Sequence, residues 1–417
     1  MDLSGKKILI CEEALIDQKG HFQTWIRAIR QMHLDAGAEV FIAGNQAVIS
    51  DVRDSLGVMP VYTVNSWDQR SIGNLPAWRR HLRVFAQNWR VFWQTRKALR
   101  ATGPVDVLFF TAVRVHHVIG LRALCAWGLG RRFKKLTCFL LTSQAQYNGD
   151  FTSFHFPRQV RLIATVLKSF NHAVRRGSVI LAGDSHITCG EYEKLTGVPM
   201  TLFPSPGADL RYEKFVRRDD GPVFTILGVS TWDKGIDVFQ EAILRFIERN
   251  PTSPASFVLQ WSVPCQGPDG VVTVISDRLR ASARVTLLEQ RLSNEEYATF
   301  FQDADFIVLP YRKTTYFNRI SGVAVEAAVS GKPMIVTEDT WLSWAVREFG
   351  SGIAVTEDDV EGWCAALEKC CAERERMLAT ARERMAVARD YNSSERYLSI
   401  LWETHFVPPD PGSDNPN

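Results

Sequence analysis

The sequence predicts an α/β protein with two parallel-sheet domains, and three observations lead to this fold class. Short apolar strands alternate with amphipathic helices along the whole chain, as they do where helices connect parallel strands. The 417 residues exceed the roughly 100–200 residues that one domain usually contains. The charged run at residues 217–222, RRDDGP, separates two such series of strands and helices. We therefore expect one domain over residues 1–218 and a second over residues 219–390.

The first series begins with an apolar strand at Lys7–Cys11 and a loop that contains Gly20 and His21. A helix is expected through Phe22–Leu34, followed by a strand at Glu39–Ala43. Three later apolar runs complete the predicted strands of this domain: Val105–Phe110, Leu136–Leu141 and Ser178–Ala182. Such runs are typical of strands that are buried on both faces of a parallel sheet.

The second series starts at the strand Val223–Gly228. Its further predicted strands are Ser256–Ser262, Arg284–Leu288, Asp305–Pro310 and Pro333–Val336. Ser293, with Glu296 three residues later, has the capping-box spacing that opens a helix before Asp303. Residues 361–397 are predicted to be largely helical, and the composition of residues 408–417 predicts a disordered tail.

The charge is divided unevenly between the two halves of the chain. Residues 1–218 contain 30 Lys and Arg against 16 Asp and Glu, a net +14, whereas residues 219–417 contain 19 against 30, a net −11. The sum is the net +3 of the whole chain. We expect only the first half to meet an anionic ligand or surface.

Much of the positive charge lies in the predicted helix Ala77–Arg100, where arginines and a lysine alternate with aromatic residues. One interpretation is an interfacial helix that contacts anionic lipid headgroups. The other is an ordinary domain helix with its aromatics in the core and its arginines in water. Nucleic acid is a weaker candidate, because no recognition motif accompanies the charge.

The eight cysteines have no CxxC spacing, which favours a reducing compartment over a disulfide framework or a structural zinc site. Acidic residues interrupt the N-terminus where a secretory apolar run would continue. The longest apolar stretch, Val118–Gly130, contains Arg122 and is shorter than the ~20 residues of a membrane span. We expect a cytoplasmic protein that is soluble or peripheral at the inner face of the membrane.

The stretch 303–337 is the most informative part of the chain. It predicts a strand, a polar loop, a helix that opens at Ser321 and Gly322, and a second strand. The free backbone N–H groups of a glycine-led helix start can bind a phosphate. Glu326, one turn later, is within reach of a ribose hydroxyl pair, although a solvated helix carboxylate is the simpler alternative. The pattern predicts half of a nucleotide-sugar site.

Taken in order, these landmarks resemble the retaining GT-B glycosyltransferases of family four, from about residue 5 to residue 407. The resemblance is carried by Lys7–Cys11 with Gly20 and His21, Gly183–Ser185, Pro204–Phe215, Gly228–Ala242, Arg291–Tyr311, Ser321–Pro333 and Tyr391–Glu403. It implies two Rossmann-like domains that face each other across a cleft, the N-terminal one for the acceptor and the C-terminal one for a nucleotide sugar. Residues 391–407 would form a helix that returns to the first domain.

The resemblance also implies site residues. Lys234 would contact the donor diphosphate, together with the N–H groups of Ser321, Gly322 and Val323, and Glu326 would hold the ribose. The remaining implied positions are Gly228, Gly235 and Leu288 on the donor side, and Gly20, His21, His116 and Thr142 on the acceptor side. Neither a metal nor an organic cofactor is expected, because no DxD-like motif lies in a convincing loop and His116 lacks a carboxylate at metal spacing.

Three positions depart from the family pattern. Thr142, with Ser143 and Gln144, follows the strand Leu136–Leu141 where the family often has a histidine that hydrogen-bonds the transferred sugar. Asn318 stands where the family usually has a first glutamate, and Val229 stands where an arginine usually partners Lys234. Arg319, beside Asn318, is our candidate to replace that arginine, and Arg312 and Lys313 are alternatives.

The expected function is that of a metal-independent, retaining hexosyltransferase. It would move a sugar from a nucleotide diphosphate sugar to a glycan or lipid-linked acceptor in polysaccharide or surface-glycan biosynthesis. Two alternatives stay open. Asn318 and Val229 favour a catalytically weak binding subunit, and a sugar-nucleotide epimerase is the second.

Overall fold

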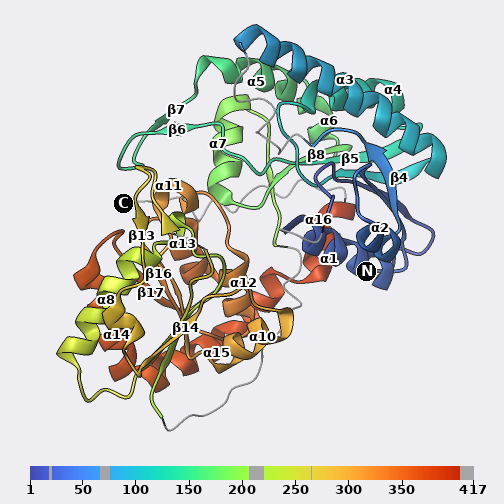
Figure 1. Ribbon diagram of the computed structural model, residues 1–417. Coiled ribbons are helices and arrows are strands. Elements are labelled where there is room, and N and C mark those ends of the chain that lie inside the picture. The colour runs from blue at the N-terminus through green and yellow to red at the C-terminus, as the bar shows by residue number, and fades with distance from the viewer. Residues whose placement is uncertain (18–20, 66–75, 206–219, 264, 404–417) are drawn as a thin grey trace. The chain divides into compact units, whose positions relative to one another are not determined.

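The computed structural model describes residues 1–17, 21–65, 76–205, 220–263 and 265–403 (Figure 1). The chain divides into two compact units, one of Met1–Gly207 with Ser394–Asn417 and one of Ala208–Ser393. The predicted boundary at residues 218 and 219 and the predicted tail at residues 408–417 lie outside the described residues. Each unit is built around one parallel sheet, which confirms the predicted fold class.

The first unit has a seven-stranded parallel sheet in the order β3-β2-β1-β4-β5-β8-β9. Its strands are β1 Lys7–Cys11, β2 Glu39–Asn45, β3 Val58–Tyr62, β4 Val105–Phe110, β5 Phe133–Phe139, β8 Val179–Gly183 and β9 Thr201–Leu202. From β1 the chain first builds outward through β2 and β3, then returns to place β4 on the other side. The topological switch point of this sheet is therefore between β1 and β4.

Helices cover both faces of the first sheet, and β1 shows why. Its residues alternate between two cores, with Leu9 packed in one and Ile8 and Ile10 in the other. The helices are α1 His21–Asp35, α2 Ser50–Leu56, α3 Ala77–Thr102, α4 Val118–Gly128, α5 Arg161–Lys168, α6 Asn171–Arg175, α7 His186–Thr196 and α16 Ser394–Trp402. A short antiparallel hairpin, β6 Gln146–Tyr147 with β7 Phe154–His155, lies outside the sheet.

The last helix, α16, is fixed to the first sheet by a buried lysine. Lys135 of β5 donates hydrogen bonds from Nζ to the carbonyl oxygens of Leu401 at 2.9 Å, Trp402 at 3.0 Å and Glu403 at 3.3 Å. The final carbonyls of a helix have no partner within the helix and carry partial negative charge, so one ammonium group satisfies several of them.

The second unit has a six-stranded parallel sheet in the order β14-β11-β10-β15-β16-β17. Its strands are β10 Val223–Ile226, β11 Ser256–Gln260, β14 Val285–Leu288, β15 Phe306–Leu309, β16 Met334–Thr337 and β17 Gly352–Val355. The order reverses between β10 and β15, which is the switch point of this sheet.

The helices of the second unit again cover two faces of the sheet. They are α8 Ile236–Arg249, α9 Asp277–Arg280, α10 Asn294–Asp303, α11 Lys313–Tyr316, α12 Gly322–Val329, α13 Trp341–Glu348, α14 Val360–Ala372 and α15 Arg374–Tyr391, with the 3-10 turn η3 Trp232–Lys234 and the hairpin β12 Cys265–Gln266 with β13 Val272–Thr273. The predicted capping box is present at α10, where Ser293 Oγ accepts from the N–H of Glu296 at 3.2 Å and Glu296 accepts from the N–H of Ser293 at 2.7 Å. Within the described ranges, no helix combines the length and the apolar content that crossing a bilayer would require.

Candidate functional site

The switch point of the second sheet brings together three of the predicted donor residues. Gly228 follows β10, and its N–H donates to Gln260 Oε1 at the end of β11, at 2.6 Å. Gly235 ends the turn η3 with a φ of +63°, and a Cβ at this position would lie 1.9 Å from the carbonyl oxygen of Pro310. Only glycine permits this approach, which presses the turn that carries Lys234 against the end of β15.

Lys234 reaches back over Gly228. A Cβ built on Gly228 would lie 2.5 Å from Lys234 Nζ, so the ammonium group occupies the space that a side chain at residue 228 would need. The same Nζ lies 5.4 Å from the ring centroid of Tyr311, which follows β15. Lys234, Gly228 and Gly235 thus form one cluster at the carboxyl ends of β10 and β15, where open α/β sheets bind their ligands.

The charge of Lys234 is poorly stabilised in the free protein. The pKa of its ammonium group is lowered to about 8, chiefly by burial and also by the positive charge of Arg319, while Asp233 opposes both effects. An anion bound next to Nζ would remove part of this cost. The geometry therefore suits a phosphate or diphosphate.

Arg312 supports the lysine turn. Its guanidinium group donates to both carboxylate oxygens of Asp237, at 2.9 and 2.8 Å, and to a carboxylate oxygen of Asp358 at 3.2 Å. It also stacks on the ring of Trp232, 4.2 Å from the centroid, and donates to the carbonyl oxygen of Trp232. Arg312 is thus engaged in fixing η3, and Lys313 Nζ pairs with Asp339 at 3.1 Å.

Of the three cations that were candidates to replace the missing arginine, Arg319 has the exposed side chain. Its guanidinium lies 5.8 Å from the ring centroid of Tyr316, and its charge acts on Lys234. The neighbouring Asn318 is half-buried.

Helix α12 begins where the sequence predicts. Ser321 caps it by accepting from the N–H of Ala324 at 3.4 Å, and Gly322 at the first turn is exposed. The N–H groups of Gly322 and Val323 belong to the first turn, where helix geometry supplies no carbonyl partner. The positive end of the helix is therefore available to an anion.

Glu326 has a different environment from the solvated helix surface that was one alternative. Its side chain is half-buried on α12, and its Oε2 accepts a hydrogen bond from the hydroxyl of Tyr297 on α10 at 2.7 Å. Burial raises the pKa of this carboxyl to about 7, and the Tyr297 hydrogen bond limits the rise. Tyr297, which sequence reasoning missed, fixes the carboxylate from the side of α10.

Tyr311 lies between the lysine turn, which contains Asp233 and Lys234, and Glu326 on α12, because charges from both act on its hydroxyl. It is buried, which raises the pKa of its hydroxyl well above the usual range, and the charges of Asp233 and Glu326 both add to this rise. Leu288, the last implied donor residue, is half-buried at the end of β14 and its carbonyl accepts from the N–H of Trp261 at 2.9 Å.

The implied acceptor residues of the first unit are less completely described. Gly20 lies outside the described residues, and of His21 only the backbone is described, at the start of α1. His116 is half-buried after β4, and burial lowers its pKa to about 4, so the imidazole is neutral at pH 7. Thr142 is half-buried after β5, and its carbonyl accepts from the hydroxyl of Tyr192 at 3.0 Å.

A buried polar cluster at the switch point of the first sheet was missed. Glu13, directly after β1, accepts from Gln87 Nε2 of α3 at 3.1 Å and lies 3.2 Å from His117 Nε2. His117 Nδ1 accepts from the backbone N–H of Arg114 at 3.0 Å. The imidazole must therefore carry its proton on Nε2 and donate it to Glu13.

Glu12 completes this cluster. Its carboxyl accepts from Thr111 Oγ1 of the β4 end at 2.5 Å and from the N–H of Ala14 at 2.8 Å. Burial raises its pKa to about 7. Two carboxylates directly after a central strand were the signal that could have identified this position from sequence. No group of three or more His, Cys, Asp or Glu residues with metal-binding proximity occurs in the part of the chain that the structure describes.

Part of the second unit matches a known protein family. Residues 221–373 match the family model described as glycosyl transferases group 1. A D-inositol 3-phosphate glycosyltransferase of Corynebacterium kroppenstedtii is 27% identical over 222 residues, which are 50% of this chain and 47% of that protein. The chain thus spans about half the length of the curated relatives that it matches.

Solved structures match nearly the whole chain. A glycosyltransferase from Rickettsia africae superimposes with a TM-score of 0.62 at 11% identity, over 95% of this chain and 99% of that one. Anabaena Alr3699/HepE, solved with UDP and glucose, gives a TM-score of 0.58 at 11% identity, over 95% and 97% of the two chains. At such low identity these matches establish the fold alone.

Proposed function

We propose that this chain, which has the GT-B fold of glycosyltransferases and a group 1 glycosyltransferase domain at residues 221–373, transfers a sugar from a nucleotide diphosphate sugar to an acceptor. The observation that carries the proposal is the position of Lys234 Nζ over Gly228 at the switch point of the second sheet. A half-buried ammonium group with a pKa lowered to about 8 is a site that gains stability from an anionic ligand.

Each donor residue has a role in this proposal. The diphosphate lies against Lys234 and the N–H groups at the start of α12, and the ribose hydroxyls bind the carboxylate of Glu326, which Tyr297 orients. Arg319 is an exposed cation whose charge acts on Lys234, and it shares the diphosphate charge. Asn318 contacts a sugar hydroxyl through its amide.

The chemistry then rests on stabilising the leaving group. The bond between the anomeric carbon and the diphosphate oxygen breaks while the acceptor hydroxyl oxygen bonds to that carbon, and the hydroxyl proton passes to the departing diphosphate. Negative charge develops on the diphosphate, so Lys234 and the dipole of α12 lower the barrier. Retention of configuration, a hexosyl donor and independence of metal follow from the resemblance to family four.

The acceptor belongs in this proposal to the basic first unit. Residues 1–218, most of which belong to this unit, contain 30 Lys and Arg against 16 Asp and Glu, and this charge suits a lipid-linked or otherwise anionic glycan at the cytoplasmic face of a membrane. Polysaccharide or surface-glycan biosynthesis is the corresponding setting. An anionic membrane surface is the proposed partner of helix α3.

The donor site is tested by thermal denaturation with UDP, GDP and ADP in turn. At 100 times its dissociation constant, the correct nucleotide should add about 2.7 kcal/mol to the free energy of unfolding. Glu326→Ala should lose this gain, whereas Glu295→Ala, an exposed carboxylate on α10, should keep it. If no nucleotide changes the melting temperature of the wild type, the proposal fails.

Asn318 and Val229 favour a second candidate, a binding subunit that holds a nucleotide sugar without efficient turnover. Release of nucleoside diphosphate in the presence of nucleotide sugar and a set of acceptors separates the two functions. A transferase releases it only with an acceptor, a binding subunit does not release it, and an epimerase converts the donor without an acceptor.

A further inference from the structure

Helix α3 has three faces instead of the two that an ordinary domain helix shows. One face is buried in the core of the first unit and includes Val91, Phe92 and Leu99. A second face carries large apolar side chains that are 40–60% exposed and recur about once per turn: Trp78, Leu82, Phe85, Trp89 and Trp93. The alternative that places the aromatic residues of this helix in the core therefore holds for Phe92 and fails for the exposed stripe.

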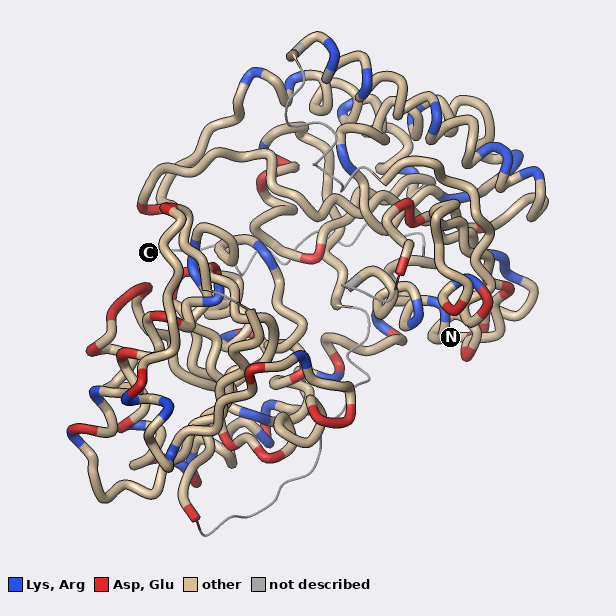
Figure 2. The backbone as a smooth tube through the Cα atoms, in the orientation of Figure 1, with Lys and Arg blue, Asp and Glu red and all other residues tan. Residues whose placement is uncertain are grey.

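The third face carries cations. Arg79, Arg83, Arg90 and Lys97 are exposed and recur every one or two turns. Figure 2 shows that basic residues occur at intervals along the whole of α3. The Arg79 guanidinium lies 5.1 Å from the ring centroid of Trp78, so charge and aromatic surface adjoin. A row of cations beside tryptophan side chains is the arrangement that suits the boundary between lipid headgroups and acyl chains.

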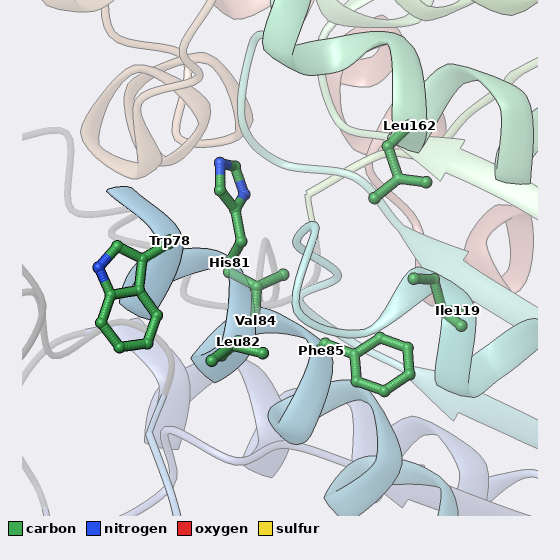
Figure 3. Close-up of a pocket in the computed structure, with 7 residues that line it drawn as sticks. All are labelled: Trp78, His81, Leu82, Val84, Phe85, Ile119 and Leu162. Atoms are coloured by element: carbon green, nitrogen blue, oxygen red, sulfur yellow. The ribbon is translucent and has the colours of Figure 1, made fainter. Parts of the chain in front are cut away.

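The apolar stripe borders a groove in the same unit. Its volume is about 550 Å³, and its lining is almost entirely carbon. The lining residues come from three helices: Trp78, His81, Leu82, Val84 and Phe85 of α3, Ile119 of α4 and Leu162 of α5. Figure 3 shows Leu162 and Ile119 on the side of the groove opposite Trp78. Leu162 is itself 54% exposed, so the apolar surface continues from α3 across to α5.

We propose that this groove binds one hydrocarbon chain of an anionic bilayer lipid, while the cation row of α3 contacts the headgroups. The charge next to the groove selects this occupant, because the exposed cations of α3 and anionic headgroups have complementary charge. In this arrangement Trp89 and Trp93 lie at the depth of the headgroups, and Trp78, Leu82 and Leu162 face the chain. The inference rests on the proposed membrane contact of α3, and it requires neither the donor site nor catalysis.

The test measures binding of the full chain to vesicles without any sugar nucleotide. Wild type should sediment with vesicles of phosphatidylglycerol and phosphatidylcholine, and more weakly with phosphatidylcholine alone. The double variant Leu82→Asp with Leu162→Asp should lose affinity by at least about tenfold, because charged side chains cannot enter the acyl region. The matched control Leu34→Asp with Val387→Asp changes exposed apolar residues on α1 and α15 and should bind as wild type does.

A second measurement does not depend on introducing charge. Vesicles with brominated acyl chains quench only tryptophans that touch the chains, so they should quench wild type more than Trp78→Phe, which keeps an aromatic ring. If the two proteins are quenched equally, or if the groove variant and its control bind vesicles equally well, the groove does not bind an acyl chain and the proposal is wrong. If the wild type binds a dispersed single-chain lipid phosphate but does not bind vesicles, the groove does not bind the chain of a bilayer lipid, and the proposal is wrong. The nucleotide-dependent melting temperature, measured in parallel, reports on the donor site alone.

Discussion

At the scale of single residues, the protonation of Lys234 predicts how the affinity for the nucleotide depends on pH. Its ammonium group has a pKa lowered from 10.5 to about 8 by burial, and a bound diphosphate restores the protonated form and raises the pKa again. The affinity for the nucleoside diphosphate is therefore highest at pH values below 8, where Lys234 is protonated. It falls as the pH rises above 8, by up to about tenfold per pH unit, until the pKa of the complex is reached.

The dependence can be measured by titration calorimetry between pH 7 and pH 10, on wild type and on Lys234→Met. The variant should bind more weakly at pH 7 and should lose the decline above pH 8. A decline of the same size in Lys234→Met would assign the titration to another group.

The residue scale also shows what sequence can predict of a site. Lys234, Gly228 and Ser321 are found from sequence because each lies in a short local pattern at the end of a strand or the start of a helix. The roles of Tyr297 and Arg312 could not be predicted from sequence. Tyr297 contacts Glu326 and Arg312 contacts Asp237, and both partners are far away in the chain. Such contacts follow from how the helices pack, and no local pattern encodes them.

At the scale of elements, strand prediction succeeded where burial on both faces gives an uninterrupted apolar run. It missed β3, whose five residues include Pro60, a residue that is uncommon inside strands. It also began the strand β5 at Leu136, three residues late, because Lys134 and Lys135 interrupt the run. Lys135 has a tertiary role that the sequence does not reveal, which is to hold the end of α16.

This role predicts a difference between two adjacent lysines. Lys135→Met leaves the last carbonyls of α16 without their buried donor and should lower the free energy of unfolding by about 1–3 kcal/mol. Lys134→Met removes an exposed ion pair with Asp106, at 2.7 Å, and should cost about 1 kcal/mol or less. Chemical denaturation of both variants checks this, and equal losses would show that the contact with α16 contributes nothing.

At the scale of the whole molecule, the change of charge near residue 218 lies close to the boundary between the two structural units after Gly207. The chain from residue 1 to 218 is basic and carries the helix α3 with its exposed aromatic stripe, whereas the chain from residue 219 onward is acidic and carries Lys234 and Glu326. The proposed binding of an anionic nucleotide to this acidic unit requires local cations, and Lys234 and Arg319 are the residues proposed to supply them.

The fold of the whole chain was predictable because strands, helices and glycine loops recur in one order over nearly its full length. The function was only partly predictable, since the relative from Corynebacterium kroppenstedtii aligns with 50% of this chain and Asn318 and Val229 depart from the family pattern. The acceptor was the least predictable part, because we propose that it binds to the first unit, where the cluster of Glu12, Glu13 and His117 had been missed.

The most direct test compares how tightly a nucleoside and its diphosphate bind to the full chain and to two variants with substitutions in the second unit. Affinities of both ligands are measured for wild type, Lys234→Met and Glu326→Ala, using the base that stabilises the wild type. The account predicts that Lys234→Met weakens the diphosphate at least about tenfold and leaves the nucleoside unchanged, while Glu326→Ala weakens both. A Lys234→Met variant that binds the diphosphate as wild type does would contradict the central claim that this lysine holds the donor phosphates.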